Sequence, residues 1–275
     1  MNKALQITLP VVGGLALAAA AAVFLTAPAR LDRTRKEAFI RRNYAHRGLH
    51  DNDKRIPENS EAAFRAAAER GYGIELDVRL TADNEPVVFH DDDLDRMCDS
   101  PGRIDETTTE ELAAMHLRGT TETVPTLNQA LDAVDGRTPV IIEIKHGHND
   151  KLLCEKVLER IDSHAGHFCI QSFDPRILCW FRKNAPDIVR GQLICSPEEL
   201  RQELPASLAF VIRQAITNLF TRPHYIAHKL GQKALGVRLC EALGAMRFCW
   251  TSRSLGNEIS NDAIIFEDYL PRPQY

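Results

Sequence analysis

The sequence predicts an α/β protein whose strands close into a (β/α)8 barrel, the TIM-barrel fold. Short apolar stretches typical of strands alternate with amphipathic stretches typical of helices along most of the 275 residues. With one hairpin strand set aside, eight strands can be counted, which is the number that closes this barrel. Polar residues stand at the ends of several of these strands, where such barrels carry their active sites. A doubly wound open sheet is the alternative.

The start of the chain predicts a separate segment. Ala4 to Ala29 contains no charged residue, and as a helix it would cross the bilayer hydrocarbon of about 30 Å. Lys3 and the small-x-small sequence Ala27-Pro28-Ala29 leave open a signal peptide, with export after cleavage. The basic cluster that follows favours an uncleaved single-pass membrane anchor with the rest of the chain in the cytoplasm; it comprises Arg30, Arg33, Arg35, Lys36, Arg41 and Arg42.

The chain is therefore divided into three parts: a transmembrane anchor at 1–29, a basic juxtamembrane segment at 30–42, and a barrel domain at 43–275. The first 42 residues carry seven Lys/Arg against two Asp/Glu, so a total charge of −4 leaves the remainder at −9. The basic segment suits an anionic lipid surface. The acidic remainder argues against a nucleic-acid partner.

Seven cysteines occur, an odd number with no Cys-x-x-Cys spacing. They are scattered through predicted strands and helices, which is typical of buried thiols and not of a disulfide framework. We therefore expect a reducing compartment.

The barrel domain begins with a strand at Tyr44–Gly48. Ser60 is placed to cap the following helix, and Gly71 can end that helix in a left-handed conformation. The second strand is Ile74–Arg79. A polar turn then leads into Pro86–His90, so this strand forms a hairpin with the second one.

Residues 91–123 are polar and rich in turns, which predicts a small insertion after the second strand. A helix from Leu127 to near Gly136 follows. Further helices are predicted at about Lys151–Ser163 and after Pro175. The remaining strands are predicted at Pro139–Ile144, His167–Phe173, Val189–Cys195, Tyr225–His228, Arg247–Trp250 and Ala263–Glu267.

The central chemical prediction concerns two carboxylates on the second strand. Residues two apart on a strand share a face, so Glu75 and Asp77 point the same way while their neighbours face an apolar layer. Two adjacent carboxylates repel each other unless one is protonated or a cation lies between them. An all-oxygen site suits Mg²⁺ or Ca²⁺. The alternative is that the two carboxylates lie in solvent at the edge of a strand and bind no cation.

Several sequence strings together strongly resemble the glycerophosphodiester phosphodiesterase family. The resemblance covers nearly all of residues 43–273. It implies a (β/α)8 barrel, one divalent cation, and hydrolysis of glycerophosphodiesters to glycerol phosphate and an alcohol. The strings are His46-Arg47-Gly48, Pro57-Glu58-Asn59-Ser60, Glu75-Leu76-Asp77-Val78, Val88-Phe89-His90-Asp91 and Glu143-Ile144-Lys145.

The resemblance also implies a role for each matching residue. By position, the metal ligands would be Glu75, Asp77 and Glu143, the phosphate-binding residues Arg47 and Lys145, and the acid and base His46 and His90. Trp250 matches a tryptophan that lines the glycerol site, with core packing as the alternative. Glu143 and Lys145 could also be a simple ion pair.

Elementary chemistry agrees with these roles. A phosphodiester is anionic, so its hydrolysis needs its charge neutralised by a cation and by Arg or Lys. Two histidines can take up and deliver the required protons near neutral pH. The resemblance implies that the glycerol 2-hydroxyl attacks first and gives a cyclic phosphate, which water then opens. Either histidine can be the base of the first step.

Other functions stay open beside this one. The His146-Gly147-His148 spacing occurs in metal-dependent amidohydrolases, but that function would leave Glu75, Asp77 and His46 without roles. The substrate could be a soluble diester of lipid and glycerol metabolism or the headgroup of a membrane lysolipid, as for a lysophospholipase D. A membrane-tethered binding protein with weak activity is a further alternative. The chain departs from the family pattern after Trp250, where little room remains for a last helix.

Overall fold

Eight parallel strands form a closed barrel in the computed structural model, which describes residues 3–51, 56–203 and 206–275. Strand β1 (Arg42–Ala45) pairs with β2 (Gly73–Leu80) on one side and with β9 (Ala263–Phe266) on the other, so the sheet closes on itself. The prediction of a (β/α)8 barrel is confirmed. The other barrel strands are β4 (Val140–Ile144), β5 (Phe168–Ser172), β6 (Val189–Ile194), β7 (Tyr225–Lys229) and β8 (Met246–Ser252).

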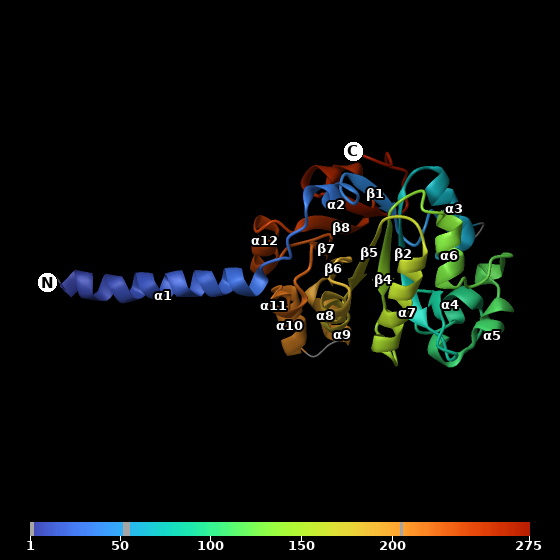
Figure 1. Ribbon diagram of the computed structural model, residues 1–275, viewed down its shortest axis with the longest axis horizontal. Helices are drawn as coiled ribbons and strands as arrows, with labels where there is room; N and C mark the ends of the chain where they lie inside the picture. Colours follow the sequence, from blue (N-terminus) through green and yellow to red (C-terminus); the bar gives the residue numbers. More distant parts are fainter. Residues whose placement is uncertain (1–2, 52–55, 204–205) are drawn as a thin grey trace.

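Helices cover the outside of this barrel (Figure 1). The cap predicted at the first of them is present, since the Ser60 hydroxyl accepts a hydrogen bond from the Ala63 amide and Gly71 has a φ of +74°. The covering helices are α3 (Glu61–Glu69), α6 (Leu127–Val134), α7 (Asp150–Ser163), α8 (Pro175–Asn184), α9 (Pro197–Glu203), α10 (Ala206–Arg213), α11 (Asn218–Thr221) and α12 (Leu235–Ala242).

Alternate residues of each strand serve two different layers. On β4, Ile142 and its outward-facing neighbours pack against the helices, whereas Ile141 belongs to the cluster inside the barrel. That inner cluster contains three stacked or neighbouring aromatic rings, those of Tyr44, Tyr225 and Phe248, with 4.2 Å between the Tyr225 and Phe248 centroids. We call these three residues the aromatic layer. It fills one part of the barrel and leaves polar side chains to the other.

Strand β2 is longer than its neighbours and continues beyond the barrel. Its last residues pair with the antiparallel strand β3 (Pro86–Val88), in the register Val78↔Val88 and Leu80↔Pro86. This confirms the predicted hairpin. It also carries the chain into the insertion above the barrel.

The insertion has short helices and a small core of its own. Leu94, Ile104 and Leu117 are among its fully buried side chains. Because it folds around these residues, the insertion can present a fixed set of side chains to the barrel. Its elements are α4 (Asp95–Cys98), η1 (Ile104–Glu106), α5 (Thr109–Ala113) and η2 (Leu117–Gly119).

Helix α1 (Lys3–Thr26) points away from the barrel at the N-terminal end (Figure 1). Its C-terminal end is fixed by Asn218, whose amide donates to the Thr26 carbonyl over 3.0 Å, and by Arg222, which donates to the Phe24 carbonyl over 2.9 Å. The short helix α2 (Arg33–Glu37) follows.

The prediction of a transmembrane anchor at residues 1–29 is not supported. A helix needs about 20 consecutive apolar residues to cross the hydrocarbon core, and within the described residues no helix is long and apolar enough to do so. Residues 1 and 2, where the predicted anchor begins, lie outside the described part of the chain.

The last helix of the barrel is replaced by a short one. Between β8 and β9 the chain forms the 3-10 helix η3 (Leu255–Ser260). The short connection expected after Trp250 is therefore present, and β9 still reaches its place between β8 and β1.

None of the seven cysteines, all of which lie in the described part of the chain, forms a disulfide. Six are buried and Cys179 is half-buried, and burial raises the pKa of the Cys169 thiol to about 12. These thiols therefore pack as small apolar groups, as the sequence predicts.

Candidate active site

Three carboxylates predicted as metal ligands meet at one end of the barrel. Glu75 and Asp77 project from β2, and Glu143 projects from β4 at the position paired with Asp77. One oxygen of each lies within 4.8 Å of the other two, and all three residues are at most 6% exposed. These residues are called the carboxylate triad below.

Lys145 neutralises part of the triad. Its Nζ lies 2.9 Å from an Asp77 oxygen and also donates to Glu143. Burial and then the charges of Asp77 and Glu143 raise the pKa of Glu75 well above its ordinary value. Burial would also raise the pKa of Asp77, but the positive charge of Lys145 and its neighbours holds it well below its ordinary value. Lys145 thus pairs with two of the three carboxylates of the triad.

Three hydrogen bonds orient two carboxylates of the triad, Glu75 and Asp77. The Asn59 amide donates to Asp77 over 2.9 Å, the Gln171 amide donates to Glu75 over 3.3 Å, and the backbone N–H of Arg47 donates to Glu75 over 3.1 Å. These bonds restrict how the carboxylates can turn. Sequence reasoning assigned no role to Asn59 or Gln171, although Asn59 lies in one of the strings that suggested the family.

Arg47 supplies a second positive charge next to the triad. It sits in a turn after β1 with a φ of +55°, and its Nη1 donates to Glu58 over 2.7 Å. Its Nε is 3.4 Å from an Asp77 oxygen. That buried N–H has no hydrogen-bond acceptor among the residues the structure describes, so it can donate to an anionic ligand.

Glu58 connects Arg47 to the insertion, because it accepts hydrogen bonds from Arg47 and from Arg96. Arg96 of α4 donates to both Glu58 oxygens over 3.0 and 2.7 Å. Although burial opposes ionisation, the hydrogen bond to Arg96 and the charge of Arg47 lower the pKa of Glu58 to about 2. Glu58 is therefore ionised at neutral pH and fixes the position of both guanidinium groups.

His46 lies at the end of β1 beside a carboxylate that sequence reasoning missed. Its Nδ1 is 3.6 Å from one oxygen of Glu267, and Nε2 of His50 is 3.6 Å from the other. The interaction with His46 lowers the pKa of Glu267 to about 2, against the effect of burial. Glu267 directly follows β9, so it reaches His46 only because β9 pairs with β1.

His90 is held from both sides at the end of the hairpin. Its Nδ1 is 2.6 Å from Asp91, and its carbonyl accepts a hydrogen bond of 2.8 Å from Nε of Arg79. Arg79 shares a face of β2 with Glu75 and Asp77. Sequence reasoning gave no role to Arg79, and the alternation along β2 was the signal that could have found it.

Trp250 and the His146-Gly147-His148 string are the two other features that the sequence singled out. The Trp250 indole donates to the Ala227 carbonyl over 2.9 Å and packs edge-on against Phe173 with 5.6 Å between ring centroids. Its contact with glycerol remains a prediction. His146 and His148 face different partners, since His146 is 2.8 Å from Asp150 whereas His148 is 4.0 Å from Asp105.

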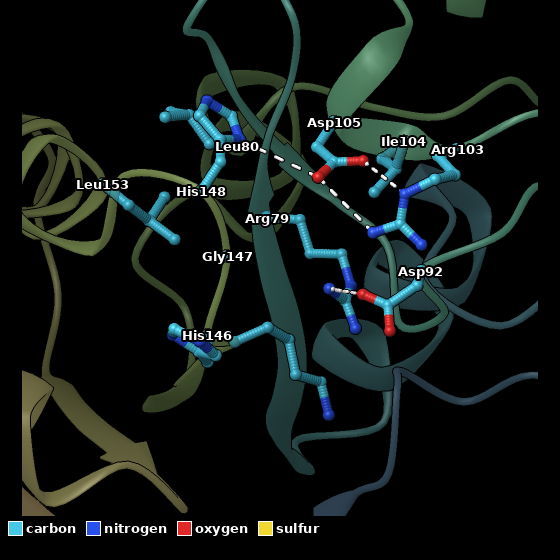
Figure 2. Close-up of a pocket in the computed structure, with 11 residues that line it drawn as sticks. Arg79, Leu80, Asp92, Arg103, Ile104, Asp105, His146, Gly147, His148 and Leu153 are labelled. Carbon is cyan, nitrogen blue, oxygen red and sulfur yellow. Dashed lines mark hydrogen bonds and ion pairs between the residues drawn. The ribbon is translucent and has the colours of Figure 1, made fainter. Parts of the chain in front are cut away.

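Cavities flank the site. One of about 250 Å³ is lined by His46, His50 and Glu267 among others. Another of about 350 Å³ lies between β2, the insertion and the loop after β4, and includes Arg79 and Lys145 in its lining (Figure 2). A buried group of carboxylates thus lies near two positive side chains, two histidines and two cavities. This arrangement suits an anionic substrate.

Comparison with known proteins gives a family match over most of the chain. Residues 46–267 match the model of the glycerophosphoryl diester phosphodiesterase family. That range contains all of the predicted metal-binding, phosphate-binding and histidine residues.

Curated relatives show the same similarity. Human glycerophosphodiester phosphodiesterase 1 is 32% identical over 157 residues, which cover 53% of this chain and 46% of the relative. A glycerophosphodiester phosphodiesterase from Caldanaerobacter subterraneus is 38% identical over 111 residues, which cover 38% of this chain and 44% of the relative. The matched part therefore spans just under half the length of these relatives.

A solved structure shares the fold. The phosphodiesterase from Oleispira antarctica, solved in complex with its product sn-glycerol-3-phosphate, superposes with a TM-score of 0.68 at 22% identity. The superposition covers 84% of this chain and 94% of that one.

Proposed function

Because the chain belongs to the glycerophosphoryl diester phosphodiesterase family, we propose that it hydrolyses glycerophosphodiesters to glycerol phosphate and an alcohol. The observation that carries this proposal is the carboxylate triad, with Lys145 and Arg47 beside it and His46 and His90 at the same end of the barrel. A site of this kind can bind a phosphodiester and move two protons.

The triad fits one divalent cation, Mg²⁺ or Ca²⁺. Its donors are buried carboxylate oxygens close enough to share an ion. Burial, and then the charges of Asp77 and Glu143, raise the pKa of Glu75. A cation bound there would neutralise the phosphate charge and polarise the phosphorus for attack. Glu75, Asp77 and Glu143 are the residues that would hold it.

Arg47 and Lys145 would bind the phosphate oxygens. Arg47 has a buried N–H without a hydrogen-bond acceptor among the described residues. Lys145 lines the larger cavity, and its Nζ lies 2.9 Å from an Asp77 oxygen. Both groups stay charged at neutral pH because neighbouring carboxylates raise their pKa values, despite burial. Fixed positive charge of this kind stabilises the charge that develops in the transition state.

His46 and His90 would transfer the protons. Each has its Nδ1 toward a carboxylate, Glu267 for His46 and Asp91 for His90. The hydrogen bond to Asp91 favours the tautomer of His90 with its proton on Nδ1 and leaves Nε2 for the substrate. Nδ1 of His46 makes no hydrogen bond among the described residues, so Glu267 acts on it through charge alone. One histidine then takes a proton from the attacking oxygen, and the other gives a proton to the leaving alcohol.

The proposal is tested by glycerol phosphate release from a glycerophosphodiester, with added Mg²⁺ or Ca²⁺. His46→Ala and His90→Ala should each lower kcat by a factor of about 10² to 10⁴ while the far-UV circular dichroism stays unchanged. His116→Ala is the matched control, because His116 is exposed on the insertion. No release by the wild-type protein would refute the function, and full turnover in a folded variant would remove that histidine from the mechanism.

A further inference from the structure

The larger cavity has Lys145, one of the two residues proposed to bind the phosphate, in its lining. Lys145 also contacts Asp77. Arg79 lines it as well and donates to the His90 carbonyl. Figure 2 shows the cavity between β2, the insertion and the loop after β4. A group attached to a phosphate bound at Lys145 and Arg47 can therefore extend into this space.

Paired charges line this cavity. Arg79 donates to Asp92 over 2.5 Å, and Arg103 donates to Asp105 over 3.0 Å (Figure 2). His148 lies 4.0 Å from the same Asp105. The lining thus holds two guanidinium donors, each paired with a carboxylate acceptor. The Arg103 side chain is 43% exposed.

We propose that this cavity binds the leaving alcohol of the diester and favours a small hydroxyl-rich alcohol, such as glycerol or a cyclitol, over a quaternary ammonium alcohol such as choline. The inference rests on the proposed function and specifies its substrate. In the reaction the bond from phosphorus to the leaving oxygen breaks and that oxygen takes a proton from a histidine. The glycerol 2-hydroxyl, or water, forms the new bond to phosphorus.

Hydrogen-bonding capacity favours the hydroxyl-rich alcohol. A hydroxyl group both donates and accepts, so neighbouring hydroxyls can donate to Asp92 or Asp105 and accept from Arg79 or Arg103. Groups of this kind replace the water that otherwise hydrates these side chains. A volume of about 350 Å³ lies at the lower end of the range for small-molecule sites, as expected for a headgroup of this size.

A quaternary ammonium group lacks matching partners there. It cannot donate a hydrogen bond, and proteins commonly bind it against aromatic faces. Among the described residues that line the cavity, none is Phe, Tyr or Trp. The carboxylates of Asp92 and Asp105 are already paired with Arg79 and Arg103, so little unbalanced negative charge remains to attract choline.

A leaving-group panel tests the inference. The full chain is assayed with glycerophosphoglycerol, glycerophosphoinositol and glycerophosphocholine, each followed by glycerol phosphate release. We expect kcat/KM to be about tenfold or more higher for the first two, as two or three added hydrogen bonds would give. Equal or faster hydrolysis of glycerophosphocholine overturns the inference and leaves the proposed function intact. No hydrolysis of any diester refutes both.

Variants connect the preference to the cavity. Arg103→Ala and Asp105→Asn should each reduce the ratio of kcat/KM for glycerophosphoinositol to that for glycerophosphocholine by about fivefold or more. Lys151→Ala is the matched control, since Lys151 on α7 is 76% exposed and pairs with Glu155 outside the cavity. A ratio unchanged in both cavity variants, with melting temperatures like that of the wild type, contradicts the assignment. Arg103→Lys, which keeps the charge, serves if Arg103→Ala does not fold.

Discussion

A single carboxylate, Glu267, faces two histidines at the rim of the barrel. Its oxygens each lie 3.6 Å from an imidazole nitrogen, one of His46 and one of His50. Of these two histidines, His46 is the one for which we propose proton transfer, because it lies in the His46-Arg47-Gly48 string that matches the family. We therefore propose that Glu267 acts on the reaction through His46, as a positioning residue.

Replacing Glu267 by glutamine tests this role. Glu267→Gln keeps the size of the side chain but removes its charge, so we expect kcat to fall about tenfold or more while KM changes little. Steady-state kinetics of glycerol phosphate release measure both parameters. Glu267→Asp should recover part of the loss because it restores the charge. A variant with wild-type kcat would show that His46 does not depend on this carboxylate.

Glu267→Gln should also change how the free energy of unfolding depends on pH. The pKa of Glu267 is lowered to about 2 in the folded protein, against about 4.3 in an unfolded chain. Its ionised form therefore stabilises the fold above about pH 4.3, and this contribution is lost as the pH falls toward 2. Between these values the free energy of unfolding should fall less steeply in Glu267→Gln than in the wild type.

At the scale of elements, close packing inside the barrel depends on glycines opposite the aromatic layer. A Cβ at Gly191 of β6 would lie 2.0 Å from the Tyr225 ring, and a Cβ at Gly73 of β2 would lie 2.4 Å from the Tyr44 ring. No side chain fits at these distances without displacing the ring. The glycines thus allow the aromatic layer to fill the barrel beneath the triad.

Gly191→Ala should lower the free energy of unfolding by about 1–3 kcal/mol, since overpacking a dense core forces side chains and backbone to shift. Chemical denaturation followed by circular dichroism measures this change. Gly147→Ala is the matched control: a Cβ there meets nothing within 4 Å, so the expected change is within about 0.5 kcal/mol. Equal stability of both variants would contradict the tight contact between β6 and Tyr225.

The strands were predictable because their pattern is local. Alternation on β2 placed Glu75 and Asp77 on one face, and the apolar run before Glu143 predicted β4. The roles of Gln171 and Glu267 were not predictable, because each depends on which strand becomes a neighbour. Gln171 reaches Glu75 across the barrel interior, and Glu267 meets His46 only when β9 pairs with β1.

At the scale of the whole molecule, barrel closure brings distant motifs to one end. His46 and Glu267 stand at opposite ends of the matched range 46–267, yet they lie side by side. The N-terminal segment shows the limit of local patterns. Its uncharged run predicted a transmembrane helix, but the described residues contain no helix able to span a membrane. The C-terminal end of α1 is instead fixed by a hydrogen bond from Asn218. A contact between residues so far apart in the sequence cannot be read from the local pattern.

The dependence of glycerol phosphate release on free Mg²⁺ or Ca²⁺ tests the central claim most directly. The account predicts that chelator abolishes hydrolysis, that either cation restores it along a saturating curve, and that folded Glu75→Ala is not restored at cation concentrations that saturate the wild type. Full hydrolysis by the wild-type protein in excess chelator would contradict a cation held by Glu75, Asp77 and Glu143.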